Sequence, residues 1–242
     1  MKFQRVMVAL DDTPAALHAL RAAAQIAQAA DAELFALRVF RDAWEGVRPD
    51  EVEGLRRRHT APADVAESRF AAMLQDTIAT TVGSARAKPL VRFGIAGIEI
   101  PRWAHDYAVD LLVLGQQPLG ALERRPSGRT LAEALQTVKV SCLVVPFGQR
   151  DWSEVLAVRA VDGDWPVDRA AEAFAALWRA KPATTMLESE EGAPDAALGA
   201  AVTRVIGQIR ERNITVVVVP ARFGERFVER APCAVLTVPE RA

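Results

Sequence analysis

Residues 110–128, with the sequence DLLVLGQQPLGALERRPSG, decide the fold. The segment begins with a short apolar run, from Asp110 to Leu114, that is typical of a strand buried on both faces of a sheet. A polar stretch bounded by glycines follows, and after Gly128 the apolar residues of TLAEALQTV have helical spacing. A strand, a glycine-bounded loop and a helix N-terminus together form a geometry in which backbone N–H groups can bind a phosphate. We expect this site at the carboxyl edge of a parallel sheet.

The composition is that of an ordinary globular protein. The 242 residues are 50% hydrophobic and 25% charged, and the net charge of −1 gives no reason to expect nucleic acid or a membrane surface as a partner. Cys142 and Cys233 lie in apolar, strand-like runs, so we interpret them as buried thiols rather than a disulfide or a metal pair. No apolar run reaches the ~20 residues of a membrane span, and the N-terminus does not resemble a signal peptide. We therefore expect a cytoplasmic protein.

Strands and helices alternate through the first part of the chain. The predicted strands share short apolar runs and comprise residues 5–10, 32–40, 89–93, 110–114 and 140–146. Helical patterns separate them, which predicts parallel strands with right-handed crossovers. We predict a doubly wound α/β domain over residues 1–147.

The pattern restarts after a short polar linker. The sequence VLAVRAV, followed by acidic residues and Pro166, echoes VMVALDDTP near the N-terminus, and both parts end similarly, in CLVVP and VLTVP. We interpret this as an internal duplication, with a second α/β domain over residues 152–242. The interval from Pro220 to Pro239 is shorter than the interval from Gly115 to Pro146. The second copy is therefore truncated, without the glycine-bounded loop and most of its helix.

The segments VMVALDDTPAA, LRVF, residues 94–115, GQQPLGALERRPSGRT and CLVVP together resemble a universal stress protein domain. The resemblance covers residues 1–147 and, more weakly, residues 154–239. It implies two adenine-nucleotide-binding-like α/β domains in tandem, and in this family such a sheet dimerises through its last strand. Some members bind ATP or AMP through a G-x2-G-x9-G-[S/T] loop, whereas others lack the loop and do not bind.

The resemblance also implies a nucleotide site. Its residues come from three strand ends and the loop: Ala9, Asp11, Val39, Leu114, Gly115, Gly128, Arg129 and Thr130. Gly115 and Gly128 match the first and third glycines of the loop, but Pro118 and Arg129 stand where the second glycine and the hydroxyl residue belong. A proline removes one N–H donor and fixes φ, which favours weak binding or a loop that is only a remnant. We expect ATP or AMP, with Mg²⁺, as the ligand if one binds.

Other chemistry is poorly supported by the sequence. Asp11 and Asp12 resemble the acidic pair of a receiver domain, but Gly115 stands where the phosphoacceptor aspartate would be. The three histidines lack metal-ligand spacing, and we find no nucleophile and base in a recognisable arrangement. We expect a stress-response binding protein that is not an enzyme. The alternatives are a slow nucleotide hydrolase at the same loop and a ligand-free protein-interaction module.

The last strand of each part predicts how the parts assemble. These strands run from Ser141 to Val145 and from Ala234 to Val238, and an exposed apolar edge strand favours association unless it is paired. We expect them to pair with each other in an intramolecular pseudo-dimer, or with the same strands of a second chain in a homodimer. We expect no nucleotide in the second part.

Overall fold

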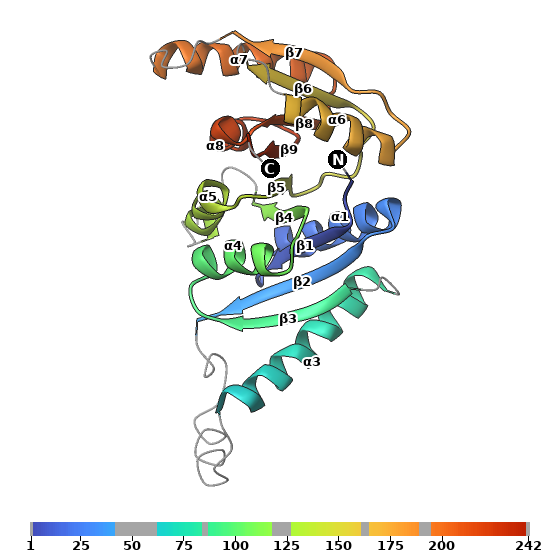
Figure 1. The fold of residues 1–242 in the computed structure, drawn as a ribbon, viewed down its shortest axis with the longest axis vertical. Coiled ribbons are helices and arrows are strands. Elements are labelled where there is room, and N and C mark those ends of the chain that lie inside the picture. Colours follow the sequence, from blue (N-terminus) through green and yellow to red (C-terminus); the bar gives the residue numbers. More distant parts are fainter. Residues whose placement is uncertain are drawn as a thin grey trace.

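The computed structural model describes residues 2–41, 62–83, 87–117, 127–160, 165–188 and 195–240. Strands and helices alternate along the chain, as Figure 1 shows. The first half comprises β1 (Arg5–Leu10), α1 (Pro14–Ala30), β2 (Glu33–Phe40), α3 (Pro62–Val82), β3 (Ala87–Phe93), α4 (Ala96–Asp106), β4 (Leu111–Gln116), α5 (Ser127–Thr137) and β5 (Ser141–Pro146). The second half comprises β6 (Val155–Ala160), α6 (Trp165–Leu177), β7 (Ala183–Leu187), α7 (Asp195–Glu211), β8 (Val216–Pro220), η1 (Ala221–Phe223), α8 (Gly224–Val228) and β9 (Ala234–Val238).

All of these strands belong to one sheet. Its nine strands follow the order β3-β2-β1-β4-β5-β9-β8-β6-β7. Neighbouring strands run parallel within each half, whereas β5 and β9 run antiparallel, with Leu143 opposite Leu236. The hydroxyl of Thr237 donates a hydrogen bond to the Cys142 carbonyl oxygen at 3.2 Å across this junction. The last strands therefore pair within the chain, which is the first of the two arrangements that the sequence predicted.

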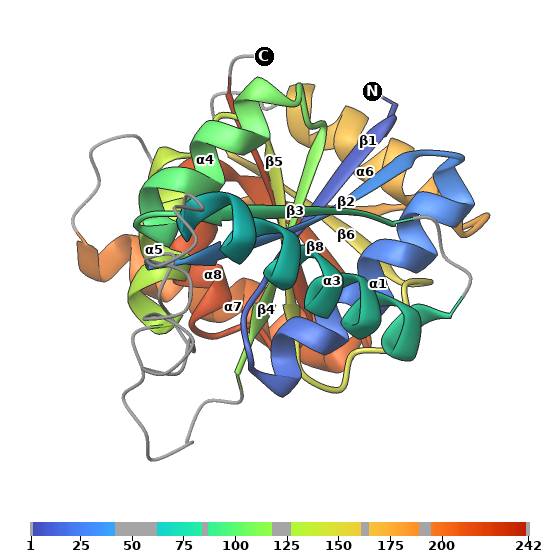
Figure 2. The ribbon, with the colours of Figure 1, turned by 90° about the horizontal axis from the view of Figure 1, so that it is seen from below.

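Helices cover both faces of the sheet (Figures 1 and 2). One apolar cluster contains buried residues of α1, α3 and α6, and a second cluster contains buried residues of α4, α5, α7 and α8. The continuous apolar runs of the central strands, such as VVVV in β8, suit this arrangement because both of their faces are buried. None of the described helices combines the length and the apolar character needed to cross a membrane.

Two helix starts show how the local sequence sets the elements. Thr13 caps α1, because its hydroxyl oxygen accepts a hydrogen bond from the Ala16 amide at 3.2 Å, and Pro14 occupies the first turn. The sequence DDTP predicted this start, with Asp12 or Thr13 as the N-cap and Pro14 in the first turn.

The sequence also predicted a helix from Ile98 to Tyr107 with Pro101 in its first turn. Helix α4 instead begins at Ala96, so Pro101 lies inside the helix and beyond its first turn. That placement was wrong because the predicted helix began two residues late.

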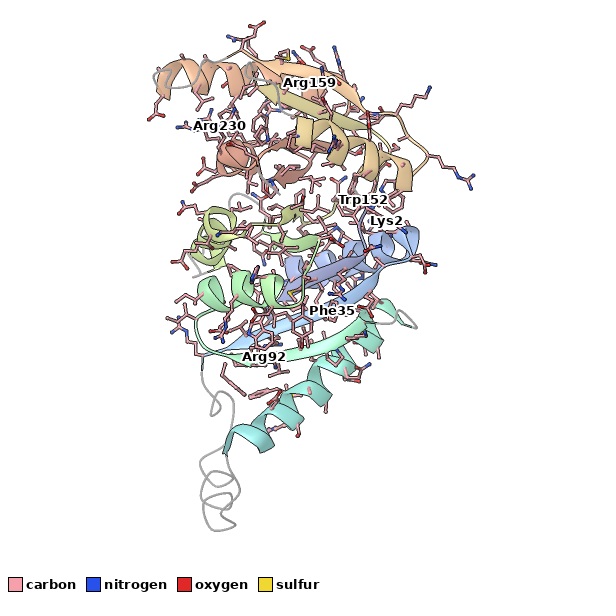
Figure 3. All side chains as sticks on the ribbon, viewed as in Figure 1. Lys2, Phe35, Arg92, Trp152, Arg159 and Arg230 are labelled. Atoms are coloured by element: carbon pink, nitrogen blue, oxygen red, sulfur yellow. The ribbon has the colours of Figure 1, made fainter. Side chains whose placement is uncertain are left out.

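Aromatic side chains hold the two halves together near the linker. Trp152 is buried just before β6 and lies between the two halves (Figure 3), and its indole N–H donates to Gln25 Oε1 on α1 at 3.1 Å. Its ring lies 6.1 Å from the ring of Phe174 on α6, which also contacts Phe3 edge to face. Trp152 therefore anchors the linker to α1 and α6, while Asp151 and Ser153 beside it remain exposed.

The second half is the shorter one in two places. Helix α8 has 5 residues, whereas α5 in the corresponding position has 11, as expected from the shorter interval after Pro220. In addition, only residues 188–194 separate β7 from α7, whereas residues 41–95 separate β2 from α4. That interval is too short for counterparts of α3 and β3, a second truncation that the sequence analysis missed.

Candidate functional site

The strand order places the switch point of the sheet at the carboxyl edge of β1 and β4. These two strands are neighbours, but the helices that follow them, α1 and α5, lie on opposite faces of the sheet. Divergence of this kind marks the point where open α/β sheets bind ligands. All eight residues of the predicted site belong to elements or turns around this edge.

Three predicted residues share one face of the sheet. Leu114 is buried in the cluster beneath α4 and α5, and Ala9 and Val39 pack against the same cluster while remaining partly exposed. The alternation of side chains along the strands explains this, because Ala9 pairs with Leu37, and Leu37 and Val39 point to the same side of β2. Ala9 and Val39 therefore form an apolar surface that is open to solvent at the strand ends.

Asp11 occupies the turn between β1 and α1. Its Oδ1 atom accepts hydrogen bonds from the amide and the hydroxyl of Thr13, at 2.9 and 2.5 Å, while the residue remains exposed. The next residue, Asp12, forms an ion pair with Arg38 of β2 at 2.5 Å. Asp11 thus has a structural role in the turn, and its exposed carboxylate lies at the edge that the resemblance assigns to the nucleotide.

Gly115 has a packing role that the sequence analysis did not foresee. A Cβ atom at this position would overlap the backbone carbonyl of Ala15 and would lie 2.9 Å from the Ala16 nitrogen. Only glycine therefore lets the first turn of α1 pack this closely against β4. The first glycine of the loop motif is required by the fold whether or not a phosphate binds.

The first turn of α5 contains the three remaining residues of the predicted site. Gly128, Arg129 and Thr130 follow Ser127, where the helix begins, one residue before the predicted start. Ala134 and Leu135 of α5 are buried in the same cluster as Leu114, so α5 covers the face on which Ala9 and Val39 lie. The amide groups of a first helical turn have no acceptor within their own helix and attract anions. Pro118 lies outside the described residues, as do Arg124 and Arg125, whose charges we expected to compensate in part for its missing N–H.

Two isoleucines at the same edge were missed by the sequence analysis. The Gly94 amide donates to the Phe40 carbonyl oxygen at 2.8 Å, which places the start of α4 beside the end of β2. Ile95 and Ile98 follow, and their side chains are 64% and 61% exposed. These exposed isoleucines add apolar surface at the start of α4, beside the end of β2. The signal in the sequence was a pair of apolar residues at the start of a helix, outside its buried stripe.

Reactive groups are scarce among the described residues. No group of three or more potential metal ligands is found in that part of the chain. Both cysteines are free and buried, as predicted; burial raises the pKa of the Cys142 thiol far above its usual range and that of Cys233 to about 12. His18 Nε2 lies 2.5 Å from the Gln149 carbonyl oxygen, and His105 lies in the last turn of α4. His59 is outside the described residues.

The second half has a corresponding edge that is closed. Pro220 pairs with Val238 as Gly115 pairs with Val145, and Ala157 pairs with Val218 as Val8 pairs with Val113. By this register, the counterparts of the apolar site residues are Val158, Leu187 and Val219. Each of these three is at most 1% exposed.

Helix α8 contributes to this closure. Its residues Phe227 and Val228 are buried in the cluster that contains the three counterparts. Where the first half has partly exposed side chains at the edge, the second half therefore has a continuous core. From the sequence we also expect Asp162 and Asp164 to be an N-capping pair before the helix that contains Pro166; both lie outside the described residues.

Comparisons with known proteins agree with this fold. A universal stress protein from Archaeoglobus fulgidus DSM 4304 has 14% sequence identity and a TM-score of 0.65, and the match covers 99% of this chain and 100% of that one. Two further matches each cover 60% of this chain and 98% of the other chain. One is the universal stress protein UspA from Lactobacillus plantarum, with 26% identity and a TM-score of 0.42, and the other is a universal stress protein in complex with cAMP, with 21% identity and a TM-score of 0.40.

The family assignment rests on the first half. A search of curated protein sequences gives no match to this chain. The model of the universal stress protein family matches residues 2–146, which is more than half of the chain. This chain therefore belongs to the universal stress protein family.

Proposed function

We propose that this chain is a non-catalytic stress-response protein whose first half binds an adenine nucleotide, ATP or AMP. The observation that carries the proposal is the partly exposed apolar surface formed by Ala9 and Val39. It lies at the carboxyl edge of the sheet, on the same face as α5. Ligand sites of this kind combine an apolar floor with a few polar groups. Here the polar groups are the Asp11 carboxylate and the amides of the first turn of α5.

The apolar surface suits a purine ring. An adenine lying on Ala9 and Val39 would be flanked by the exposed side chains of Ile95 and Ile98, which would lose contact with water on binding. In this arrangement the Asp11 carboxylate accepts hydrogen bonds from ribose hydroxyls. The base and the sugar would thus contact the exposed groups at the ends of β1 and β2 and at the start of α4.

The phosphates belong at the first turn of α5 in this proposal. Backbone amides of Gly128, Arg129 and Thr130 would donate to phosphate oxygens, and the positive end of the helix dipole would favour the anion. Mg²⁺ would neutralise part of the phosphate charge in ATP. Because Pro118 has no N–H to donate, we expect weak binding: one hydrogen bond to a charged group contributes roughly 1.5–3 kcal/mol, or about 10- to 150-fold in affinity.

We further propose that the second half is a degenerate copy of the first and binds no nucleotide. In support, β7-β6-β8-β9 repeats the arrangement β2-β1-β4-β5, and the two copies meet through an antiparallel pair of last strands. The counterparts of the site residues are buried, and Pro220 replaces Gly115. The chain would then be a pseudo-dimer with one ligand site.

Calorimetric titration of the full chain with ATP, AMP and cAMP, with and without Mg²⁺, tests this proposal. Ile98→Lys places a charge beside the adenine and should weaken ATP binding at least about tenfold, which corresponds to about 1.4 kcal/mol. Met73→Lys is the matched control, because Met73 is 52% exposed on α3, and it should bind as the wild type does.

Three outcomes contradict the proposal. Equal ATP binding by wild type and Ile98→Lys would place the nucleotide elsewhere. No binding by the wild type would favour the ligand-free interaction module. Magnesium-dependent phosphate release by the wild type, lost in Gly128→Trp, would favour the nucleotide hydrolase.

A further inference from the structure

The sheet ends in two edge strands that differ in how well their sequences protect them against pairing with another strand. Because β5 and β9 pair with each other, the described sheet ends at β3 on one side and at β7 on the other. Strand β3 carries Lys88, Pro89 and Arg92, and charges and prolines of this kind prevent edge-to-edge association. Strand β7 has the sequence ATTML, with no charge and no proline. Of the two edges, β7 is therefore the one suited to pairing with another strand.

The exposure of β7 agrees with this difference. Ala183 and Thr184 are exposed, Met186 is 45% exposed, and only Leu187 is buried. Strand β7 corresponds to β2, because each pairs with the first strand of its half, and β2 is covered on its outer side by β3. Figure 1 shows β7 at the end of the molecule, beyond β6. Because the second half lacks a counterpart of β3, β7 lies at an edge of the sheet, whereas its counterpart β2 lies between two strands.

A small groove runs beside this edge. Its volume is about 180 Å³, and its lining includes Met186 of β7 and Ala201 and Val205 of α7. Gln208 also lines the groove, and its buried Oε1 atom has no hydrogen-bond partner among the described residues. The edge therefore offers apolar contact area and an unused acceptor as well as the backbone of the strand.

The charges that flank β7 favour one partner and one orientation. Lys181 precedes the strand and Glu188 follows it, and both are exposed. If two copies of β7 pair antiparallel about a two-fold axis through Thr185, Thr184 lies opposite the partner subunit's Met186. The same pairing brings Lys181 near the partner subunit's Glu188, at both ends of the pair. Parallel pairing would instead place like charges together, so the strand is complementary to itself only in the antiparallel sense.

We propose that two copies of this chain form a dimer through antiparallel pairing of their β7 strands. The interface is isologous, as in most homodimers, and it closes the association at two chains. The groups that form this interface are the backbone of β7, the exposed side chain of Met186, and the charges of Lys181 and Glu188 from each copy. Strands of five residues bury little area, so the dimer belongs to the weak, transient class of interfaces below about 1,200 Å². Nucleotide binding in the first half does not enter this proposal.

Sedimentation velocity of the full chain over a range of concentrations tests the proposal. The wild type should show a reversible monomer–dimer equilibrium. Met186→Lys, which brings a charge to the strand pair, should weaken dimerisation at least tenfold, whereas Met73→Lys on α3 should leave it unchanged. A wild type that stays monomeric at every concentration, or a dimer that Met186→Lys does not weaken, would overturn the proposal.

A charge exchange tests the orientation. Lys181→Glu should weaken the dimer, because it places two carboxylates together at each end, and the double variant Lys181→Glu/Glu188→Lys should restore it. Glu188 also pairs with Arg204 at 3.4 Å, but both side chains are more than half exposed, so losing this contact should not unfold the chain. Failure of the double variant to restore the dimer would overturn the antiparallel arrangement.

A disulfide tests the position of the axis. Directly opposed residues of antiparallel strands have Cα atoms about 4.5–5.5 Å apart, within the reach of a disulfide. Thr185→Cys should therefore form a cross-linked dimer on mild oxidation, much faster than Met73→Cys, while the two natural cysteines stay buried. Equal cross-linking rates for the two variants would exclude β7 as the interface.

Discussion

The two carboxyl edges of this molecule have the same strand arrangement but opposite surfaces. In the first half, Ala9 and Val39 remain partly exposed, and Ile95 and Ile98 at the start of α4 are exposed. In the second half, the counterparts Val158 and Leu187 are buried. A shared fold therefore does not imply a shared ligand site, because the helices that follow the matching strands β4 and β8 differ in length and packing.

The largest loss of stability is expected at the carboxyl edge of the second half, where side chains of α8 are buried. Phe227→Ala removes a fully buried ring from α8 and should lower the free energy of unfolding by about 3–5 kcal/mol. The chain should nevertheless gain no affinity for ATP, since the second half has no counterpart of the loop before α5. Chemical denaturation and calorimetric titration of this variant check the two expectations. A second ATP site in Phe227→Ala would show that the ring alone separates the two edges.

The next effect concerns the close packing of α1 on β4 in the first half. Gly115→Ala should cost about 1–3 kcal/mol of stability, because the added methyl group meets the Ala15 backbone rather than a movable side chain. Gly207→Ala is the control: it lies within α7 with open space around it, and alanine there should stabilise the helix by up to about 1 kcal/mol. Urea denaturation of the two variants measures both changes in the free energy of unfolding. Unchanged stability in Gly115→Ala would contradict the packing role of this glycine.

A smaller effect is expected at the turn that carries Asp11. Thr13→Ala removes the hydroxyl that caps α1 and donates to Asp11, and should cost about 1 kcal/mol. Thr13→Ser keeps the hydroxyl and should retain most of the stability. Thermal unfolding of the two variants, followed by circular dichroism, separates the cap from other effects. If alanine and serine lower the melting temperature equally, the hydroxyl is not the group that matters.

Much of the fold could be predicted from the sequence. Apolar runs such as LLVL in β4, followed by glycine and helical spacing, identify strands and crossovers because both patterns are local. The shared ends CLVVP and VLTVP also predicted the pairing of β5 with β9 as one of two arrangements. The choice between pairing within one chain and between two chains depends on contacts between distant segments, which periodicity does not contain.

The candidate site was predictable only in part. The family resemblance named Ala9, Val39 and Leu114 as site residues. That they share one face depends on the register between strands, which the sequence does not contain. The packing role of Gly115 depends on how closely α1 approaches β4, and the exposure of Ile95 and Ile98 depends on what covers the start of α4. The closure of the second edge by Phe227 likewise depends on packing between α8 and strands that precede it in the chain.

The most direct test of the account is the number of nucleotides bound by one chain. Native mass spectrometry of the full chain with ATP and Mg²⁺ measures this number for each oligomeric state. We predict one nucleotide per chain, lost in Ile98→Lys and retained in Met73→Lys. Two nucleotides per chain, or none, would contradict the account that one edge of the sheet is open and the other is closed.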